Sequence, residues 1–274
     1  MTLPQAIILG FIQGLTEFLP ISSTAHLILI PWLFNWTIEP NAAFAFDVLV
    51  QLGTLLAVIV YFAKDLWHMA MAMVNGLRTG KPFESVDARL GWLVILATLP
   101  AALIGLLFKK YFAALHQMPV IVAAILFLAA GLIFIVEYVG QRNRDLKTLN
   151  WIDALVIGCS QALALFPGVS RSAATLSGGL MRGLERPAAA RFSFLMSIPI
   201  LLAAGVLAAI DLVDIPNFTA LLPPLLVAFI VAAIVGFASI HWLLGYLAKH
   251  SLNIFAWYRL GFGALCLVIA LLRR

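Results

Sequence analysis

Charged residues and cysteines are both scarce in this chain of 274 residues. Only 11% of the residues are Asp, Glu, Lys or Arg, whereas 64% are hydrophobic and the mean hydropathy is +1.07. This small number of charges cannot cover the surface of a soluble domain. The composition therefore excludes a soluble globular protein and indicates a polytopic membrane protein. The two cysteines, Cys159 and Cys266, lie in apolar stretches, which excludes a disulfide framework and a thiolate metal site.

Basic residues outnumber acidic ones by 17 to 12, which gives a net charge of +5 and a pI near 9.5. In a soluble chain this balance would favour nucleic acid as a partner. Here most lysines and arginines fall in loops between apolar runs, where they set membrane topology, so no nucleic-acid partner is expected. A signal peptide is not expected either, because no basic segment precedes the first apolar run and that run contains Gln13 and Glu17.

Six apolar runs are long enough, or nearly so, to cross the roughly 30 Å hydrocarbon core of a bilayer as helices. They lie at about 44–62, 91–108, 119–138, 192–212, 221–247 and 254–272. Two further regions, 4–34 and 151–183, each hold two short apolar pieces that a polar stretch separates. Broken segments at corresponding places in two halves are typical of re-entrant hairpins that line a site inside the membrane. The predicted fold is therefore all-α, with six transmembrane helices and two re-entrant helical hairpins.

The two halves of the chain repeat one pattern. At an offset of 148 residues, and without a gap, five residues of the first half meet identical residues of the second: Gly10, Gln13, Leu15, Phe18 and Ser22 pair with Gly158, Gln161, Leu163, Phe166 and Ser170. The polar content differs, since three polar residues of the first half, Glu17, Ser23 and Thr24, fall on Leu165, Arg171 and Ser172. We interpret the chain as a single membrane domain, 1–274, built from repeat one at about 1–140 and repeat two at about 150–274.

Lysines and arginines divide unequally between the two sides of the membrane if each hairpin enters and leaves on the same side. Eleven fall on one side: Lys64, Arg78, Lys81, Arg89, Arg142, Arg144, Lys147, Arg182, Arg186, Arg191 and Lys249. Four fall on the other: Lys109, Lys110, Arg273 and Arg274. The positive-inside rule makes the first side cytoplasmic and places both termini outside. Three spans in each half make the repeats inverted and bring the hairpin tips together within the membrane. Glu17, His26 and Arg171 can then share one site, which we expect to be reached from outside.

Four charged residues are the clearest candidates for positions inside the membrane: Glu17, Asp47, Arg171 and Arg259. Such residues are costly to bury and are usually functional. Gln13 lies four residues before Glu17 on one helix face, and carboxylate and amide oxygens without cysteine suit a hard cation such as Mg²⁺ or Ca²⁺. Asp47 is expected to be a hydrogen-bonded residue near the mouth of the site. For Arg259, a structural ion pair or a contact with a lipid headgroup is favoured over catalysis.

The first hairpin also carries hydroxyls and a histidine after the break at Pro20. Ser23 and His26 are three residues apart, which favours a hydroxyl nucleophile with the imidazole as its base, or equally a histidine nucleophile with supporting hydroxyls. Ser22 and Thr24 are expected to contribute further hydroxyls to the substrate site.

The second hairpin places Arg171 and several hydroxyl residues directly after a Pro-Gly break at 167–168. Pro-Gly ends the preceding helix, and Ser170 can cap the next one. Free backbone N–H groups, the guanidinium and the hydroxyls of Ser170, Ser172 and Thr175 would then point at one spot, which predicts a phosphate site. Phosphoryl transfer needs such charge neutralisation together with a nucleophile in line, and a phosphorylated lipid is the natural substrate of such a site in a bilayer.

Both motifs resemble the signatures of one family, the undecaprenyl-pyrophosphate phosphatases or bacitracin-resistance integral membrane proteins. They read Gln13-x-x-x-Glu17 with Pro-x-Ser-Ser-Thr-x-His26, and Pro167-Gly-x-Ser-Arg-Ser-x-x-Thr175. The likeness covers nearly the whole chain, including Phe-Asp-Val-Leu-Val-Gln-Leu-Gly at 46–53 and Phe-Ser-Phe-Leu at 192–195. One position departs from the family pattern: Gln13 stands where the first acidic residue is often Glu, which rules out a second carboxylate ligand there.

The resemblance implies hydrolysis of undecaprenyl pyrophosphate to undecaprenyl phosphate and inorganic phosphate, dependent on a divalent cation. This reaction would recycle the lipid carrier for peptidoglycan and other cell-envelope synthesis at the bacterial cytoplasmic (inner) membrane. By position, the resemblance assigns acid and metal functions to Glu17, nucleophile or base functions to Ser23 and His26, and pyrophosphate binding to Ser170, Arg171, Ser172 and Thr175.

A secondary transporter or flippase of a phosphorylated lipid is the alternative, because inverted repeats with broken helices are characteristic of alternating-access carriers. A carrier needs no Ser/His pair beside an acid. We therefore favour the enzyme, with Ser23 as nucleophile and His26 as its base. A homodimer is an expectation that the sequence neither requires nor excludes.

Overall fold

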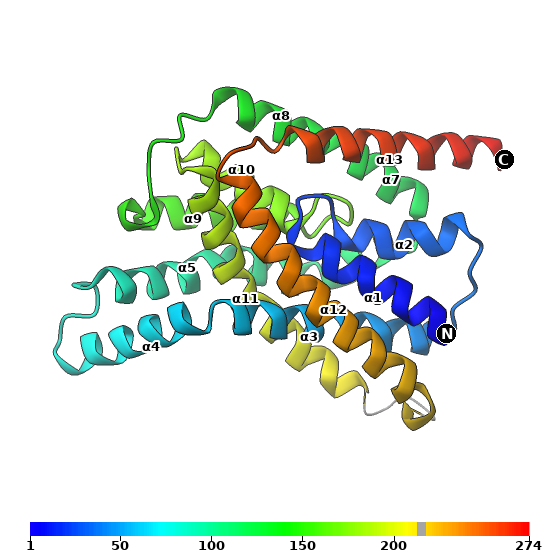
Figure 1. Cartoon of the computed structure of the whole chain (residues 1–274), viewed down its shortest axis with the longest axis horizontal. Helices are drawn as coiled ribbons and strands as arrows, with labels where there is room; N and C mark the ends of the chain where they lie inside the picture. The colour runs from blue at the N-terminus through cyan, green and yellow to red at the C-terminus, as the bar shows by residue number, and fades with distance from the viewer. Residues whose placement is uncertain (213–217, 274) are drawn as a thin grey trace.

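The computed structural model describes residues 1–212 and 218–273; residues 213–217 and 274 lie outside the described part, and with them Arg274 of the topology count. Within the described part the chain is helical, with no strand, which confirms the all-α class (Figure 1). In chain order the helices are α1 (Leu3–Phe18), α2 (Ser23–Leu33), α3 (Pro40–Tyr61), α4 (Ala63–Arg78), α5 (Val86–Leu107), α6 (Lys109–His116), α7 (Pro119–Leu128), α8 (Ala130–Val139), the 3₁₀ helix η1 (Leu146–Thr148), α9 (Trp151–Leu163), α10 (Arg171–Met181), α11 (Arg186–Leu212), α12 (Phe218–Leu247) and α13 (Asn253–Leu272).

Six helical segments among the described residues are long and apolar enough to cross a membrane. They are Pro40–Tyr61, Val86–Leu107, Pro119–Val139, Arg186–Ala208, Leu221–Leu247 and Asn253–Leu272. They match the six predicted runs, the largest difference being the earlier start of the fourth. α7 and α8 together form the third span. The protein is therefore a multi-pass membrane protein.

One predicted loop is partly helical. The sequence predicts a loop between the first two spans, whereas α4 occupies most of it and packs against α5. Gly91 of α5 leaves room for the side chain of Met73 in α4, because a Cβ there would collide with its sulfur. α4 is amphipathic, with exposed Trp67 and Leu77 as well as basic residues. A search for continuous apolar runs misses such a helix, because its apolar face is only a stripe.

The two interrupted regions form helix pairs with the same backbone geometry at the turn. Ser22, between α1 and α2, has φ 73°, and Ser170, between α9 and α10, has φ 76°. Each serine hydroxyl caps the following helix by accepting the N–H of Ala25 (3.3 Å) or Ala173 (3.2 Å). A left-handed backbone is uncommon for serine, so its recurrence at paired positions indicates that both motifs adopt one local conformation.

Glycine allows the first helix of each motif to approach a span of the other half closely. α1 packs against α12, and α9 packs against α5. A Cβ at Gly10 would lie 2.8 Å from the carbonyl oxygen of Ala228, and a Cβ at Gly158 would collide with the carbonyl oxygen of Ala97. Gly10 and Gly158 are partners in the 148-residue offset. Each half therefore packs its first helix against the second span of the other.

The start of α9 lies at the end of the molecule opposite the two termini (Figure 1). The buried carboxylate of Asp153 accepts from Arg144 at 2.7 Å and from Arg182 at 2.6 Å, which holds the start of α9 beside the end of α10. The hydrogen bonds from Arg144 to this carboxylate raise the pKa of Arg144 above its ordinary value. At the end where both termini lie, Arg273 donates to the carbonyl oxygen of Trp32 at 2.8 Å. Arg144 and Arg182, which the sequence assigns to one side, thus lie at the opposite end from Arg273.

Candidate functional site

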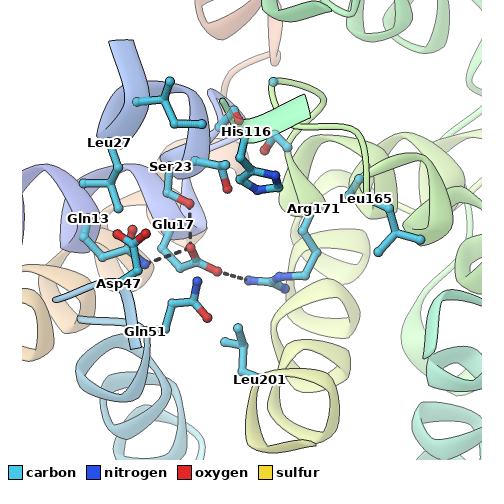
Figure 2. A pocket seen from close by; sticks show the side chains of 16 residues that line it. Gln13, Glu17, Ser23, Leu27, Asp47, Gln51, His116, Leu165, Arg171 and Leu201 are labelled. Carbon is cyan, nitrogen blue, oxygen red and sulfur yellow. Dashed lines mark hydrogen bonds and ion pairs between the residues drawn. The ribbon is translucent and has the colours of Figure 1, made fainter. Parts of the chain in front are cut away.

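A polar pocket of about 330 Å³ lies where the turns of the two helix pairs meet (Figure 2). Both motifs contribute to its wall, so the expectation that they share one site agrees with the geometry. The lining residues are Gln13, Glu17, Ser22, Ser23, Thr24, Leu27 and Ile28 from the first motif, Ala164, Leu165, Gly168, Ser170 and Arg171 from the second, and Asp47, Gln51, His116 and Leu201 from other helices.

Glu17 is the centre of the hydrogen bonding in this pocket. One carboxylate oxygen pairs with the Arg171 guanidinium at 3.0 Å, although the two residues are 154 positions apart. The other oxygen accepts from the Ser23 hydroxyl at 2.7 Å and from the Gln13 amide at 3.1 Å. The acid of the first motif, its serine and the arginine of the second are therefore in direct contact, as Figure 2 shows.

Arg171 keeps hydrogen-bonding capacity for an anion. Its side chain is 13% exposed, and beyond the bond to Glu17 its only hydrogen bond within the described part of the chain is a long one of 3.4 Å to the carbonyl oxygen of Ser193. Its Nε is buried and has no partner among the described residues. A buried donor without an acceptor is unfavourable, so the guanidinium is prepared to receive oxygen atoms from a bound group.

The predicted contact between His26 and Ser23 is absent, because both ring nitrogens of His26 bind elsewhere. Nδ1 contacts the carbonyl oxygen of Ser22 at 2.7 Å, and Nε2 contacts the Tyr258 hydroxyl at 2.7 Å. The ring also stacks on Phe262 and is almost fully buried. The carbonyl can only accept, so Nδ1 carries the proton and Nε2 accepts from tyrosine. His26 does not line the pocket, and the group next to the Ser23 hydroxyl is Glu17 instead.

The predicted hydroxyl cradle is divided between the pocket wall and the structure behind it. Ser170 lines the pocket, as do Ser22 and Thr24. Ser172 is fully buried and donates to the carbonyl oxygen of Leu19 at 2.9 Å, which joins the two turns. Thr175 lies one helical turn further on and donates to the carbonyl oxygen of Arg171 at 2.8 Å. Neither of the last two hydroxyls lines the pocket.

Arg259 in α13 has a structural position, but its partners differ from those the sequence suggested. The residue is fully buried, which excludes a contact with a lipid headgroup. Its guanidinium donates to the carbonyl oxygens of Gly168 at 2.9 Å and of Pro20 at 3.4 Å. These partners are backbone carbonyls, whereas one of the two predictions was an ion pair. Pro20 and Gly168 are partners in the 148-residue offset. One arginine thus holds equivalent points of both turns together.

The pocket contains two polar residues that were not predicted from the sequence as site residues, Gln51 and His116. Gln51 lies four residues after Asp47 on α3, the same spacing as Gln13 and Glu17, and this repeated spacing could have identified it. No sequence signal identifies His116. It ends the short helix α6, where its Nδ1 contacts the carbonyl oxygen of Phe112 at 2.8 Å, and its imidazole is directed into the pocket (Figure 2).

Oxygen donors for a cation come from two helices. Asp47 lines the pocket, near the site as predicted, but its carboxylate makes none of the predicted hydrogen bonds with the described residues. It adds a second carboxylate to that of Glu17, and Gln13 and Gln51 add amide oxygens. The described residues hold no cluster of three or more His, Cys, Asp or Glu side chains that could bind a metal by themselves. This set therefore suits a hard cation whose remaining ligands are oxygens of a bound phosphate or water.

Comparison with known proteins agrees with the motifs. The family model described as Bacitracin resistance protein BacA matches residues 6–265. A protein of Chlorobaculum tepidum named undecaprenyl-diphosphatase is 45% identical over 271 residues, covering 96% of this chain and 95% of its own. A Moorella thermoacetica protein of the same name is 43% identical over 274 residues and covers all of both chains. The chain belongs to the bacitracin resistance protein BacA family.

Proposed function

We propose that this protein hydrolyses undecaprenyl pyrophosphate to undecaprenyl phosphate and inorganic phosphate, and so recycles the lipid carrier for peptidoglycan and other cell-envelope synthesis. The observation that carries the proposal is the contact of Ser23 with Glu17 and of Glu17 with Arg171 in one pocket. A serine hydroxyl beside a carboxylate can act as a nucleophile with its base, and an arginine with unused donors can bind the phosphoryl oxygens. These are the groups that phosphoryl transfer requires. Relatives of the same length bear the name of this activity.

Glu17 replaces His26 as the proposed base. In the proposed reaction, Glu17 takes the Ser23 proton over their 2.7 Å hydrogen bond while Oγ attacks the terminal phosphorus. The new bond is Oγ–P, the P–O bond to the bridging oxygen breaks, and undecaprenyl phosphate leaves. Water then hydrolyses the phosphoserine, releasing inorganic phosphate and restoring the hydroxyl. Arg171 stabilises charge on the phosphoryl oxygens throughout.

The other proposed site residues fall into two groups, those that line the pocket and those that support its wall from behind. Ser22, Thr24 and Ser170 line the pocket and can donate hydroxyls to phosphate oxygens. Ser172 and Thr175 act through the backbone, since their hydroxyls hold the turn that presents Arg171. This assignment revises the prediction that all these hydroxyls touch the pyrophosphate.

We propose a divalent cation, Mg²⁺ or Ca²⁺, as cofactor, held by Glu17 and Gln13, as the sequence predicts, together with Asp47. When bound, it would neutralise charge on the pyrophosphate. Asp47→Asn should then weaken cation binding at least about tenfold, because it removes one of two carboxylates. Isothermal titration of the purified protein with Mg²⁺ or Ca²⁺ measures this. Unchanged affinity in Asp47→Asn would remove this residue from the cation site.

Phosphate release from the detergent-solubilised protein tests the activity against the alternative, a transporter or flippase, which would release none. Ser23→Ala should abolish release. Arg171→Lys should lose most of it while remaining folded, because lysine keeps the charge but lacks the planar pair of donors.

Acid quenching during turnover should trap phosphoserine at Ser23, which survives acid, whereas a phosphohistidine would not. Substantial turnover by folded Ser23→Ala would exclude this nucleophile.

We also propose that the two helix pairs are re-entrant hairpins of inverted repeats in the bacterial cytoplasmic (inner) membrane, with the site facing the periplasm or outside. Three observations support this: the matching turns at Ser22 and Ser170, the exchanged packing of Gly10 and Gly158, and the separation of Arg144 and Arg182 from Arg273. A homodimer and the absence of a nucleic-acid partner stay predictions, and native mass spectrometry measures the former directly.

A further inference from the structure

A second hollow lies beside α5 and the start of α9. Its volume is about 820 Å³, and its lining residues are Phe83, Arg89, Trp92, Leu93, Ile95, Leu96, Leu99, Lys147, Thr148, Leu149, Asn150 and Trp151. It shares no residue with the pocket that holds Glu17. The proposed phosphatase chemistry uses none of these residues, so the hollow calls for a separate explanation.

The wall of this groove is apolar and faces outwards. Phe83 is 63% exposed, Trp151 62% and Leu99 49%. Ile95 and Leu99 belong to a membrane span, so this part of the groove opens towards lipid rather than water. An open apolar channel on a span accommodates a hydrocarbon chain without desolvating polar groups.

One end of the groove is cationic. Arg89 lies in the first turn of α5, and one of its N–H groups donates to the carbonyl oxygen of Lys147 at 2.6 Å, which fixes the guanidinium beside the Lys147 backbone. None of the described residues that line the groove is acidic. The nearest acid on the same turn, Asp87, lines a different cavity together with Arg191. Two positive charges therefore lack a matching carboxylate within the groove.

The distance between the two ends matches an amphipathic lipid. Leu99 follows Arg89 by ten residues, which corresponds to about 15 Å along the helix. A lipid whose headgroup contacts Arg89 and Lys147 would therefore lay an acyl chain along Ile95 and Leu99.

We propose that this groove binds one anionic phospholipid of the surrounding bilayer, with its phosphate at Arg89 and Lys147 and an acyl chain along Ile95 and Leu99. A zwitterionic phospholipid has the same acyl chains but adds a cation that the two basic residues would repel. The site therefore selects for net negative charge. This inference is independent of the proposed phosphatase activity.

Native mass spectrometry of the purified full-length protein tests the proposal, with dioleoyl-phosphatidylglycerol and dioleoyl-phosphatidylcholine as probes. We expect one phosphatidylglycerol to be retained at concentrations at which phosphatidylcholine is lost. Lys147→Gln should weaken phosphatidylglycerol binding about fivefold, as expected for one basic residue near the headgroups. Leu99→Trp should block the groove. None of these variants changes the proposed phosphatase site.

Matched controls separate this site from general lipid adhesion. Lys64→Gln removes an exposed lysine that does not line the groove, and Ile234→Trp adds an indole to an exposed position of α12. Both controls should retain phosphatidylglycerol as the wild type does. Equal retention of the two lipids, or equal losses in the groove variants and the controls, would overturn the proposal. Displacement of phosphatidylglycerol by an equimolar amount of undecaprenyl phosphate would overturn the choice of occupant in favour of the isoprenoid carrier.

Discussion

At the residue scale, the site consists of contacts that spacing predicts and contacts that it does not. The hydrogen bond between Gln13 and Glu17 follows from their spacing of four residues, which puts both side chains on one face of α1. The contact of Ser23 with Glu17 crosses the break between two helices, and Arg171 reaches Glu17 from the other half of the chain. Sequence identified these residues as a group, but only the folded turn determines which group faces the Ser23 hydroxyl.

His26 illustrates the limit of a local rule. A spacing of three residues on one helix puts its side chain on roughly the same face as Ser23. This spacing predicted that His26 is the base for the Ser23 hydroxyl. The position of the imidazole is determined instead by Tyr258, 232 residues away, and by the Ser22 carbonyl oxygen. Because that carbonyl belongs to the turn with positive φ, we interpret His26 as a positioning residue for this turn.

Substitution of Tyr258 separates the positioning role from a catalytic one. Tyr258→Phe removes the donor to Nε2 and should lower both the Tm and kcat/KM, the latter by no more than about tenfold, since no proton transfer is lost. His26→Asn keeps a donor near the position of Nδ1 and should give a loss of similar size. Phosphate-release kinetics and thermal unfolding measure the two effects. A loss of about a thousandfold or more in His26→Asn, with Tyr258→Phe near wild type, would instead identify His26 as the base.

At the element scale, two turns of equal geometry are held together from the centre. Ser172 donates to the carbonyl oxygen of Leu19, and Arg259 reaches carbonyl oxygens of both turns. A fully buried guanidinium is costly unless its donors are satisfied, so this arrangement fixes the turns relative to each other. Close helix packing at Gly10 and Gly158 then places each turn at the end of a helix that cannot shift outwards.

Alanine substitution of the paired glycines tests this packing. Gly10→Ala and Gly158→Ala should both lower the Tm by several degrees, because the added Cβ meets a backbone carbonyl that cannot move like a side chain. Gly261→Ala is the matched control, since nothing lies within 4 Å of a Cβ there. It should leave the Tm unchanged or raise it, as expected for alanine inside a helix. Thermal unfolding in detergent measures all three. Equal Tm values across the set would contradict the close approach.

At the scale of the whole molecule, the sequence predicted what depends on continuous patterns. The six spans follow from apolar length alone, and their positions agree with the structure. The family follows from motifs that extend over nearly the whole chain. α4 was missed because its apolar face is a stripe, and His116 was missed because a short helix brings it to the pocket from outside both motifs. Contacts between distant segments leave no local pattern in a single sequence.

The predicted orientation of the molecule in the membrane determines from which side the substrate must enter the pocket. Asn41, at the start of α3, and Asn143, before α9, are both exposed and lie on opposite sides in the proposed topology. In a Cys159→Ser background, which removes the exposed native thiol, Asn41→Cys should react with a membrane-impermeant thiol reagent in intact cells. Asn143→Cys should react only after permeabilisation, because eleven of the fifteen assigned basic residues share its side. Labelling of Asn143→Cys in intact cells, with Asn41→Cys protected, would reverse the topology and place the pocket on the cytoplasmic side.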